Sequence, residues 1–328
     1  MPIAVVTGAS AGVGRATAIA FAQRGWKVAL LARGEAGLEG ARRDVVEAGG
    51  EALAIRTDVA DHAQVEAAAD RVEREWGPID VWVNNAMATI FAEFLDVTPE
   101  EFERATAVTY LGAVWGTRAA LARMKPRNRG TIVQVGSALA YRSIPLQSPY
   151  CGAKSALRGF TDALRSELLH DKSGVHLTMV HLSAFNTPQF DWGRSRMPRM
   201  PRPMGKVFQP EVAAEAVCWA AHHKRRELWV GWPAAQAILG QRVIPGALDH
   251  YLASTAFDGQ QTDEPARPDR PDNLFAPAPG GDRGAHGGFG AEAKRSSAQL
   301  WLTTHRTALA LAVLPLMALA LSRRLLAR

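Results

Sequence analysis

The stretch Ile3-Ala-Val-Val-Thr-Gly-Ala-Ser-Ala-Gly-Val-Gly14 joins a short apolar run to glycines at positions 8, 12 and 14. The run Ile3–Thr7 is typical of a buried strand, and the glycines indicate a tight turn that opens a helix. Such a turn lets backbone N–H groups approach a pyrophosphate, and the helix N-terminus favours its negative charge. The stretch therefore predicts a dinucleotide site, although a turn that binds no ligand could use the same glycines.

Short apolar runs then alternate with longer amphipathic stretches along the chain. The predicted strands are Ile3–Thr7, Lys27–Leu31, Ala52–Thr57, Ile79–Asn84, Thr131–Val135, Val175–His181 and Glu227–Val230. The predicted helices are Gly14–Arg24, Ala36–Ala48, Ala63–Trp76, Phe102–Met124, Ser148–His170 and Pro210–His222. This alternation predicts an α/β fold, a parallel sheet with helices on both faces and right-handed crossovers.

The end of the second predicted strand bears on the choice of nucleotide. A site for NAD usually places an acidic residue there to bind the adenosine ribose, but this chain has Ala32 followed by Arg33. The planar guanidinium of Arg33 can pair with a 2′-phosphate. We therefore expect NADP(H) rather than NAD. The alternative is that Arg33 is only solvated, and even then the missing acid weakens the case for NAD.

Tyr150 and Lys154 stand four residues apart on a predicted helix, and Ser137 lies thirteen residues before Tyr150 at the end of an apolar run. Residues at this spacing share one helix face, so the ammonium of Lys154 is expected to lower the pKa of the Tyr150 hydroxyl. A phenol of lowered pKa can donate and accept protons near neutral pH. Taken singly, each residue has a structural alternative: a half-buried tyrosine, a solvated lysine and a turn serine.

These motifs together resemble the short-chain dehydrogenase/reductase family. T-G-x-x-x-G-x-G, N-N-A (Asn84-Asn-Ala86), and a serine followed by Y-x-x-x-K occur in the family's order over residues 1–255. The resemblance implies a Rossmann-type, doubly wound sheet of about seven strands in the order 3-2-1-4-5-6-7. It also implies a homodimer or homotetramer that interconverts a carbonyl and an alcohol on a small molecule.

The family's site residues carry over to matching positions. The resemblance implies that Tyr150 is the acid/base. It also implies that Lys154 stabilises the phenolate and binds the nicotinamide ribose, and that Ser137 orients the carbonyl. Asp58, which could instead cap a helix, and Val59 would contact the adenine. Thr187, which could also be an N-cap, would reach the nicotinamide carboxamide. The full predicted cofactor set is Gly8, Ser10, Gly12, Val13, Gly14, Arg33, Asp58, Val59, Asn85, Ala86, Tyr150, Lys154 and Thr187.

Three departures from the family pattern favour a second interpretation of the function. Thr109 stands where many members carry an asparagine that holds a water in the proton relay to the lysine, Met87 replaces a glycine after N-N-A, and a Pro-Gly motif is missing before Thr187. The hydroxyl of Thr109 is shorter than an asparagine side chain but can still bond a water. The alternative function is an NADP-binding module with little catalysis, acting as a membrane-recruited scaffold.

Charge and cysteine content exclude several other classes of protein. The chain has 328 residues and a net charge of +6, but the stretches 191–206 and 294–328 carry an excess of basic residues, so the remainder is net negative. We therefore expect no nucleic-acid partner. The two cysteines have no metal-type spacing, which predicts no metal site and a reducing compartment. With no secretory signal peptide in view, we expect a cytoplasmic protein.

The substrate region is predicted to be a mobile cap over residues 188–209. Its aromatic and methionine side chains suit a lipophilic carbonyl or alcohol substrate. Its arginines suit a carboxylate, a phosphate or an anionic membrane surface, unless they are simply solvated.

Three segments divide the chain by composition. Residues 1–257 form the predicted catalytic domain, 258–299 a Pro/Gly-rich linker or draped extension, and 300–328 an apolar C-terminal helix. The uncharged run Thr307–Leu321 is short for a full bilayer span and contains Pro315. It predicts membrane association, or else burial in a groove of the body or of a partner subunit.

Overall fold

The fold is built on a parallel sheet whose strand order matches the prediction. The computed structural model describes residues 1–267 and 269–306. The sheet runs β12-β7-β6-β4-β1-β2-β3, and every neighbouring pair is parallel. Its strands are β1 (Ile3–Thr7), β2 (Lys27–Ala32), β3 (Glu51–Arg56), β4 (Val81–Asn84), β6 (Gly130–Ser137), β7 (Val175–Leu182) and β12 (Glu227–Val230). The doubly wound α/β fold is therefore confirmed.

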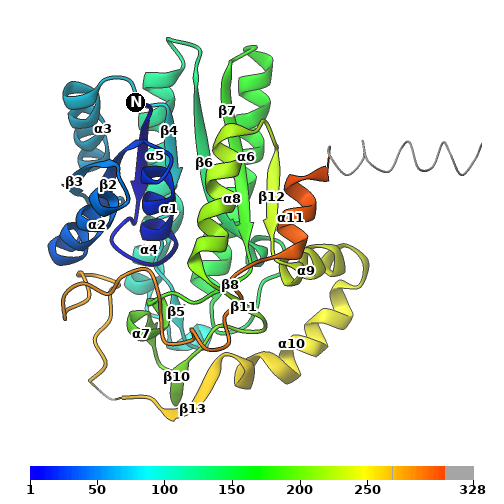
Figure 1. Cartoon of the computed structure of the whole chain (residues 1–328). Helices are drawn as coiled ribbons and strands as arrows, with labels where there is room; N and C mark the ends of the chain where they lie inside the picture. The colour runs from blue at the N-terminus through cyan, green and yellow to red at the C-terminus, as the bar shows by residue number, and fades with distance from the viewer. Residues whose placement is uncertain (268, 307–328) are drawn as a thin grey trace, which may run out of the picture.

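Helices cover both faces of this sheet, as the layers in Figure 1 show. One face is covered by α1 (Gly12–Ala22), α2 (Glu35–Glu47) and α8 (Pro210–His222), of which α1 packs on both others. The other face is covered by α3 (His62–Trp76), α4 (Pro99–Thr106), α5 (Gly112–Met124) and α6 (Ser148–His170). Because both faces are covered, β1 is buried over its whole length and reads as a continuous apolar run.

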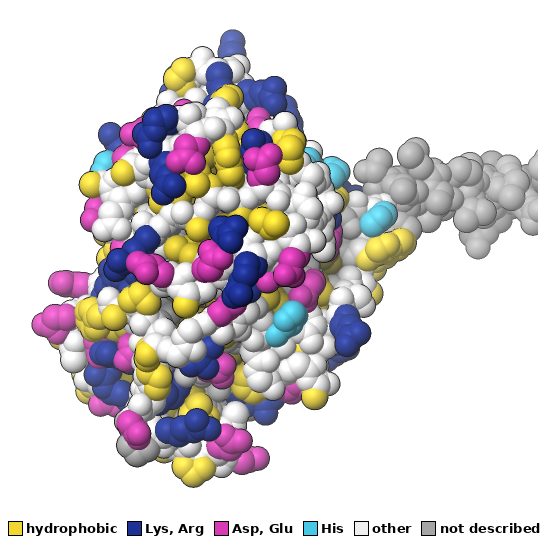
Figure 2. Space-filling model, turned by 60° about the vertical axis from the view of Figure 1, so that its left-hand side comes forward, with side chains coloured by type: hydrophobic (Ala, Val, Ile, Leu, Met, Phe, Trp, Pro, Cys, Tyr) yellow, Lys and Arg dark blue, Asp and Glu magenta, His cyan; other side chains and the backbone are white. Residues whose placement is uncertain are grey.

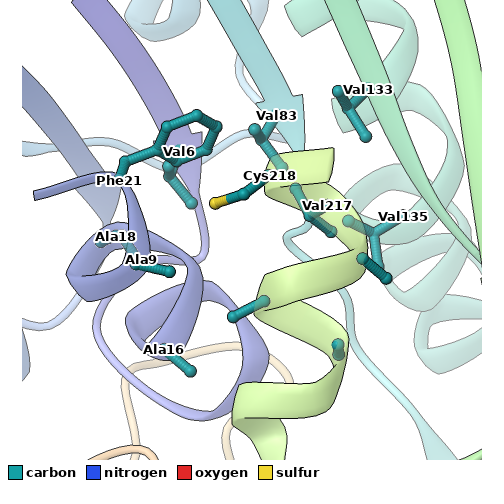
Figure 3. Packing of buried hydrophobic residues seen from close by; sticks show 14 of the residues in the cluster. Val6, Ala9, Ala16, Ala18, Phe21, Val83, Val133, Val135, Val217 and Cys218 are labelled. Atoms are coloured by element: carbon teal, nitrogen blue, oxygen red, sulfur yellow. The ribbon is translucent and has the colours of Figure 1, made fainter. Parts of the chain in front are cut away.

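Small side chains let α1 and α8 lie close together over the sheet. Figure 3 shows Ala16, Ala18 and Phe21 of α1 beside Val217 and Cys218 of α8. Phe21 is fully buried, so its truncation to alanine would cost about 3–5 kcal/mol of unfolding free energy. This packing holds the N-terminus of α1 firmly against the carboxyl end of β1.

The predicted helix Phe102–Met124 is wrong in its start and its continuity. The helix begins earlier, at Pro99, because Thr98 and Glu101 form a reciprocal capping box. A π-helical turn, η2 (Ala107–Leu111), then separates α4 from α5. The turn contains Thr109, and such turns are frequent at functional sites.

The C-terminal part of the chain wraps around the carboxyl end of the sheet. The cap contains α7 (Gln189–Trp192), β9 (Arg194–Ser195), β10 (Arg199–Pro201) and β11 (Val207–Phe208). Its strands β9 and β11 pair with β5 (Ile90–Phe91) and β8 (Ala184–Phe185) of the body. The cap is followed by α9 (Trp232–Val243), α10 (Pro245–Gly259), β13 (Gln261–Pro265), which pairs antiparallel with β10, and α11 (Ala298–Thr304). The Pro/Gly-rich stretch after β13 crosses beneath the sheet in Figure 1 before the chain reaches α11.

The surface carries both signs of charge. On the face shown in Figure 2, lysine and arginine side chains are interspersed with aspartate and glutamate. Within residues 1–267 and 269–306, no helix combines the length and the apolar character needed to cross a bilayer. The run Thr307–Leu321, to which the membrane prediction refers, lies outside the described residues.

Candidate functional site

A cavity of about 270 Å³ opens at the carboxyl ends of the central strands. This edge of an open α/β sheet is where ligands bind in such folds. Among the predicted site residues, the cavity brings together Gly8, Ser10, Gly12, Val13, Arg33, Asp58, Val59, Asn85, Ala86, Tyr150, Lys154 and Thr187. The glycine-rich turn lies toward one end of this set, and Tyr150 and Lys154 come from α6.

The glycine-rich turn has the geometry that its residues predict. Gly8 and Gly12 have φ angles of 65° and 57°, in the left-handed region where glycine is favoured. Gly14 allows close packing, because a Cβ atom there would collide with the carbonyl oxygen of Gly8. Helix α1 begins at Gly12 with no side-chain cap and no acidic residue in its first turn. Its dipole and its N-terminal N–H groups after Gly12, whose own N–H donates to the Gly284 carbonyl, are therefore suited to an anion.

Asn85 braces this turn against the end of β4. Its side-chain Nδ2 donates to the carbonyl oxygens of Thr7 and Gly8 at 3.0 and 3.3 Å. The backbone N–H groups of Asn85 and Ala86 both donate to the hydroxyl of Thr7, at 2.9 and 3.1 Å. These bonds join the ends of two adjacent strands and shape the wall of the cavity.

Tyr150 and Lys154 line the cavity, and Ser137 lies beside Tyr150 without being among the lining residues. Ser137 ends β6, and its buried hydroxyl accepts a hydrogen bond from the Leu139 backbone N–H at 3.1 Å. The Nζ of Lys154 lies 5.6 Å from the centre of the Tyr150 ring and donates to the carbonyl oxygen of Val135 at 2.6 Å. The lysine is therefore held in place by the sheet itself.

Burial governs the acidities in this group. It raises the pKa of Tyr150, while the nearby Ser137 hydroxyl acts in the opposite direction. It lowers the pKa of Lys154 to about 8. Burial is thus the main influence on the Tyr150 pKa in this arrangement, and the expected lowering by Lys154 is not among its causes.

A dinucleotide fits the residues of this cavity. Glycines allow the backbone to approach a phosphate group, an uncapped helix N-terminus and Arg33 supply positive potential, and Tyr150 and Lys154 lie on the same cavity. The fit rests on this donor chemistry and on the tight packing of the turn, because a Cβ at position 8 or 14 would collide with Ala86 or with the Gly8 carbonyl.

Comparison with known proteins agrees with this geometry. The short chain dehydrogenase family profile matches residues 2–195. The chain belongs to the short-chain dehydrogenase/reductase family. It is 33% identical over 291 residues to the uncharacterized oxidoreductase YxnA of Bacillus subtilis, a match that covers 88% of this chain and 82% of that protein.

Two further relatives add to this picture. The chain is 31% identical to the 3-ketodihydrosphingosine reductase of Bos taurus, over 65% of this chain and 66% of that protein. An alcohol dehydrogenase of the archaeon Thermococcus sibiricus, solved with 5-hydroxy-NADP, superimposes with a TM-score of 0.61 and 28% identity over 70% of this chain and 96% of its own. This short-chain dehydrogenase is therefore an oxidoreductase by family.

Arg33 and Asp58 line the cavity but already have partners within the protein. The guanidinium of Arg33 donates to the backbone carbonyls of Asn273 and Leu274. The carboxylate of Asp58 accepts from Arg104 at 2.6 Å and from the Ala60 N–H at 3.0 Å. The N-cap of α3 is Asp61, so Asp58 does not cap that helix.

The hydroxyl of Thr109 makes two hydrogen bonds to the backbone of a single residue, Ala88. The hydroxyl donates to the Ala88 carbonyl at 3.0 Å and accepts from the Ala88 N–H at 2.9 Å. The side chain is fully buried. Its hydroxyl proton is therefore committed to fixing the loop after β4, and only its remaining lone pair is available to a water.

Thr187 and Met87 both line the cavity, near the point where the family pattern departs. A Cβ atom at Gly12 would lie 3.2 Å from the Cβ of Thr187, so the threonine packs directly on the glycine-rich turn. The N-cap of α7 is Pro188, and Thr187 therefore has no capping role. Its position is compatible with the predicted contact to a cofactor.

The arginines of the cap are paired within the protein. Arg194 and Arg196 both donate to the carboxylate of Glu101, a side chain that is only 3% exposed. Arg194 also bonds Asp272, Arg199 bonds Asp258 and Arg202 bonds Glu292. Arg194 and Arg196 therefore tie the cap to Glu101 of the body, whereas Arg199 and Arg202 make exposed ion pairs with the C-terminal extension.

Sequence reasoning missed a buried polar cluster behind Ser137. His181 of β7 places Nδ1 3.1 Å from the Ser137 carbonyl oxygen and Nε2 3.4 Å from the carboxylate of Glu227. That carboxylate accepts from the Tyr141 hydroxyl at 2.7 Å. Burial alone would raise the pKa of Glu227, but its contacts with His181, Tyr141 and Trp229 lower it to about 2. The signal for this cluster in the sequence is a histidine and a glutamate within two predicted strands, Val175–His181 and Glu227–Val230.

Proposed function

We propose that this short-chain dehydrogenase is an NADP(H)-dependent oxidoreductase that interconverts a lipophilic ketone or aldehyde and its alcohol. The observation that carries the proposal is the single cavity that contains the glycine-rich turn at the N-terminus of α1 together with Tyr150 and Lys154 of α6. A module that only bound the nucleotide could use Lys154 for the ribose but would have no use for a proton donor such as Tyr150.

The roles of the side chains follow from their positions. When bound, the nicotinamide supplies or accepts the hydride. In the reducing direction the Tyr150 hydroxyl donates its proton to the carbonyl oxygen, and the Ser137 hydroxyl donates a hydrogen bond to the same oxygen as negative charge develops there. The ammonium of Lys154, held by the Val135 carbonyl, stabilises the phenolate that forms on Tyr150. In the oxidising direction the same groups act in reverse.

The choice of NADP(H) rests on the edge of the cavity near β2. Arg33 lies there, Ala32 cannot bind a ribose diol, and the backbone carbonyls of Asn273 and Leu274 orient the guanidinium. A guanidinium has five donors, so these bonds leave others for a 2′-phosphate. The bound 5-hydroxy-NADP in the archaeal relative is consistent with this choice.

The lipophilic substrate class rests on the lining of the cavity. Met87, Phe185 and Trp192 give the wall apolar and adaptable surface. The name of the bovine relative describes the reduction of 3-ketodihydrosphingosine, which belongs to the same class of reaction. We further propose that the C-terminal run Thr307–Leu321 attaches the protein to a membrane, since α11 before it exposes about half of Trp301 and Leu302.

The test is the oxidation of NADPH, followed at 340 nm, by purified protein with a panel of lipophilic ketones and aldehydes. Tyr150→Phe should lower turnover by a factor of about 100 or more, since general acid catalysis contributes 10²–10⁴-fold. Tyr251→Phe removes the same hydroxyl from a tyrosine that is 57% exposed on α10 and should have no effect. Equal turnover by the two variants would refute the proposed role of Tyr150.

A further inference from the structure

Residues 270–287, which we call the strap, cross the open side of the cavity described above. In Figure 1 this orange segment runs beneath the carboxyl end of the sheet, below α2 and past α7. The strap residues that line the cavity are Asn273, Pro277, Ala278, Gly281 and Arg283. The wall of the cavity is therefore completed by a segment that lies outside the matched family region, residues 2–195.

The first tether holds the strap at the end of the cavity near β2. Arg33 donates to the Asn273 and Leu274 carbonyls, and the Nε of Arg104 donates to the Leu274 carbonyl at 3.0 Å. The side chain of Leu274 is fully buried in the core cluster on the α3 and α5 side of the sheet. This end of the strap is thus anchored by both polar and apolar contacts.

The second tether holds the strap over the glycine-rich turn. The Gly12 N–H donates to the Gly284 carbonyl at 3.2 Å, and the buried guanidinium of Arg15 pairs with the carboxylate of Asp282. Gly40 of α2 makes room for that carboxylate, because a Cβ atom at position 40 would collide with it. The strap and helices α1 and α2 are therefore fitted to each other.

Arg283 lies between these contacts and has little to neutralise it. It lines the cavity and immediately precedes Gly284, whose carbonyl bonds the first residue of α1. Its guanidinium donates to the Pro279 carbonyl at 3.3 Å. The charge of Arg283 opposes the effect of burial, which raises the pKa of Asp191 on α7. Within residues 1–267 and 269–306, however, no carboxylate lies within 4 Å of the Arg283 guanidinium. A guanidinium and the N-terminus of α1 thus border one cavity.

We infer that the strap is part of the cofactor site and that Arg283 binds the pyrophosphate of the dinucleotide. The inference rests on the proposed function, because it takes the ligand of the cavity to be a nicotinamide dinucleotide. Arg33 borders the adenosine end, whereas Arg283 lines the cavity next to Gly284, whose carbonyl bonds the turn at Gly12 where a pyrophosphate is expected. The two arginines therefore have separable roles: Arg33 reads the 2′-phosphate, and Arg283 reads the pyrophosphate common to both nucleotides.

The experiment measures the dissociation constants of NADPH and NADH for the full-length protein by nicotinamide fluorescence. Arg283→Gln should weaken both nucleotides by the same factor, about tenfold. Arg33→Gln should weaken NADPH far more than NADH. Arg74→Gln removes the same charge from an exposed position on α3 and is the matched control.

Each outcome of this comparison is informative. Unchanged binding in Arg283→Gln, or a loss confined to NADPH, overturns the pyrophosphate assignment and leaves the proposed function intact. A wild-type protein that binds neither nucleotide overturns the proposed function itself.

A second variant tests the strap as a closure. Asp282→Asn breaks the ion pair to Arg15, which keeps Asp44 as a partner, so the fold is expected to persist. The variant should release NADPH several times faster in stopped flow. NADPH should also slow tryptic cleavage after Arg270 and Arg283 in the wild-type protein. A wild-type release rate together with unprotected cleavage would show that the strap does not enclose the nucleotide.

Discussion

The Nδ1 atom of His181 lies 3.1 Å from the backbone carbonyl oxygen of Ser137, across the neighbouring strands β6 and β7. A carbonyl only accepts, so Nδ1 must carry the proton in this contact. The other ring nitrogen faces the carboxylate of Glu227 at 3.4 Å. The imidazole therefore lies between the end of the strand that presents Ser137 and a half-buried acid on the edge strand.

We predict that His181→Phe lowers turnover about tenfold with little change in NADPH affinity, because the serine loses its support while the nucleotide contacts remain. His181→Asn keeps an N–H group near the position of Nδ1 and should restore part of the rate. Steady-state kinetics together with fluorescence titration of NADPH would check both. Parallel losses of rate and NADPH affinity would instead indicate general damage to the fold.

Thr109 provides a second prediction, based on its two hydrogen bonds to Ala88. Thr109→Val keeps the shape of the side chain but leaves the buried N–H and carbonyl of Ala88 without this partner. Each unsatisfied group should lower the free energy of unfolding by about 1–3 kcal/mol. We expect a lower melting temperature and reduced turnover. Thr109→Asn offers both a donor and an acceptor and should preserve or raise turnover. A large loss of activity in Thr109→Asn with unchanged stability would show that the threonine itself is required.

Lys154 should reduce the stability of the protein without cofactor. Its folded pKa of about 8 is below the ordinary value of 10.5, so between these pH values the unfolded chain binds more protons and stability rises with pH. Below pH 8 the buried ammonium costs on the order of 3 kcal/mol. Lys154→Met should therefore be more stable at pH 7 while turning over poorly.

Urea unfolding at several pH values tests the Lys154 prediction. The advantage of Lys154→Met should shrink between pH 8 and pH 10.5. A methionine variant that is less stable than wild type at pH 7 would mean that the bond to Val135 outweighs the desolvation of the ammonium.

Glu101 anchors the cap through Arg194 and Arg196. Hydrogen bonding from Arg196 is the main reason that the pKa of Glu101 falls to about 2, against the opposing effect of burial. A lowered acid pKa contributes stability that is present above the ordinary value of 4.5 and is lost as pH falls toward 2. Glu101→Gln should remove on the order of 1–3 kcal/mol, because Arg196 loses its carboxylate partner while Arg194 keeps Asp272, and should raise KM for the substrate.

The exposed glutamate of the Glu39–Arg42 pair on α2 supplies the control. Glu39→Gln makes the same chemical change on the surface and should leave KM unchanged. Limited proteolysis of residues 194–202 would report the state of the cap directly. Equal KM and equal cleavage in the two variants would contradict the anchoring role of Glu101.

The fold was largely predictable because its signals are local. The strands of the sheet were found within a few residues of their ends, since an apolar run between turn residues is read from consecutive positions. The break at η2 was missed, because a π turn at Thr109 is stabilised by Ala88, which stands on a different segment. The run Thr307–Leu321 stays a prediction, since it lies outside the described residues.

By itself, the sequence determined the order of strands and helices, the glycine-rich turn and the spacing of Tyr150 and Lys154. All of these depend on the conformation of neighbouring residues along the chain. Only the tertiary structure decided that His181 supports Ser137, 44 positions away, and that Arg33 meets Asn273, 240 positions away. Hydrogen bonds and ion pairs act over a few ångströms of space, and a sequence does not show which distant residues the folded sheet brings within that range.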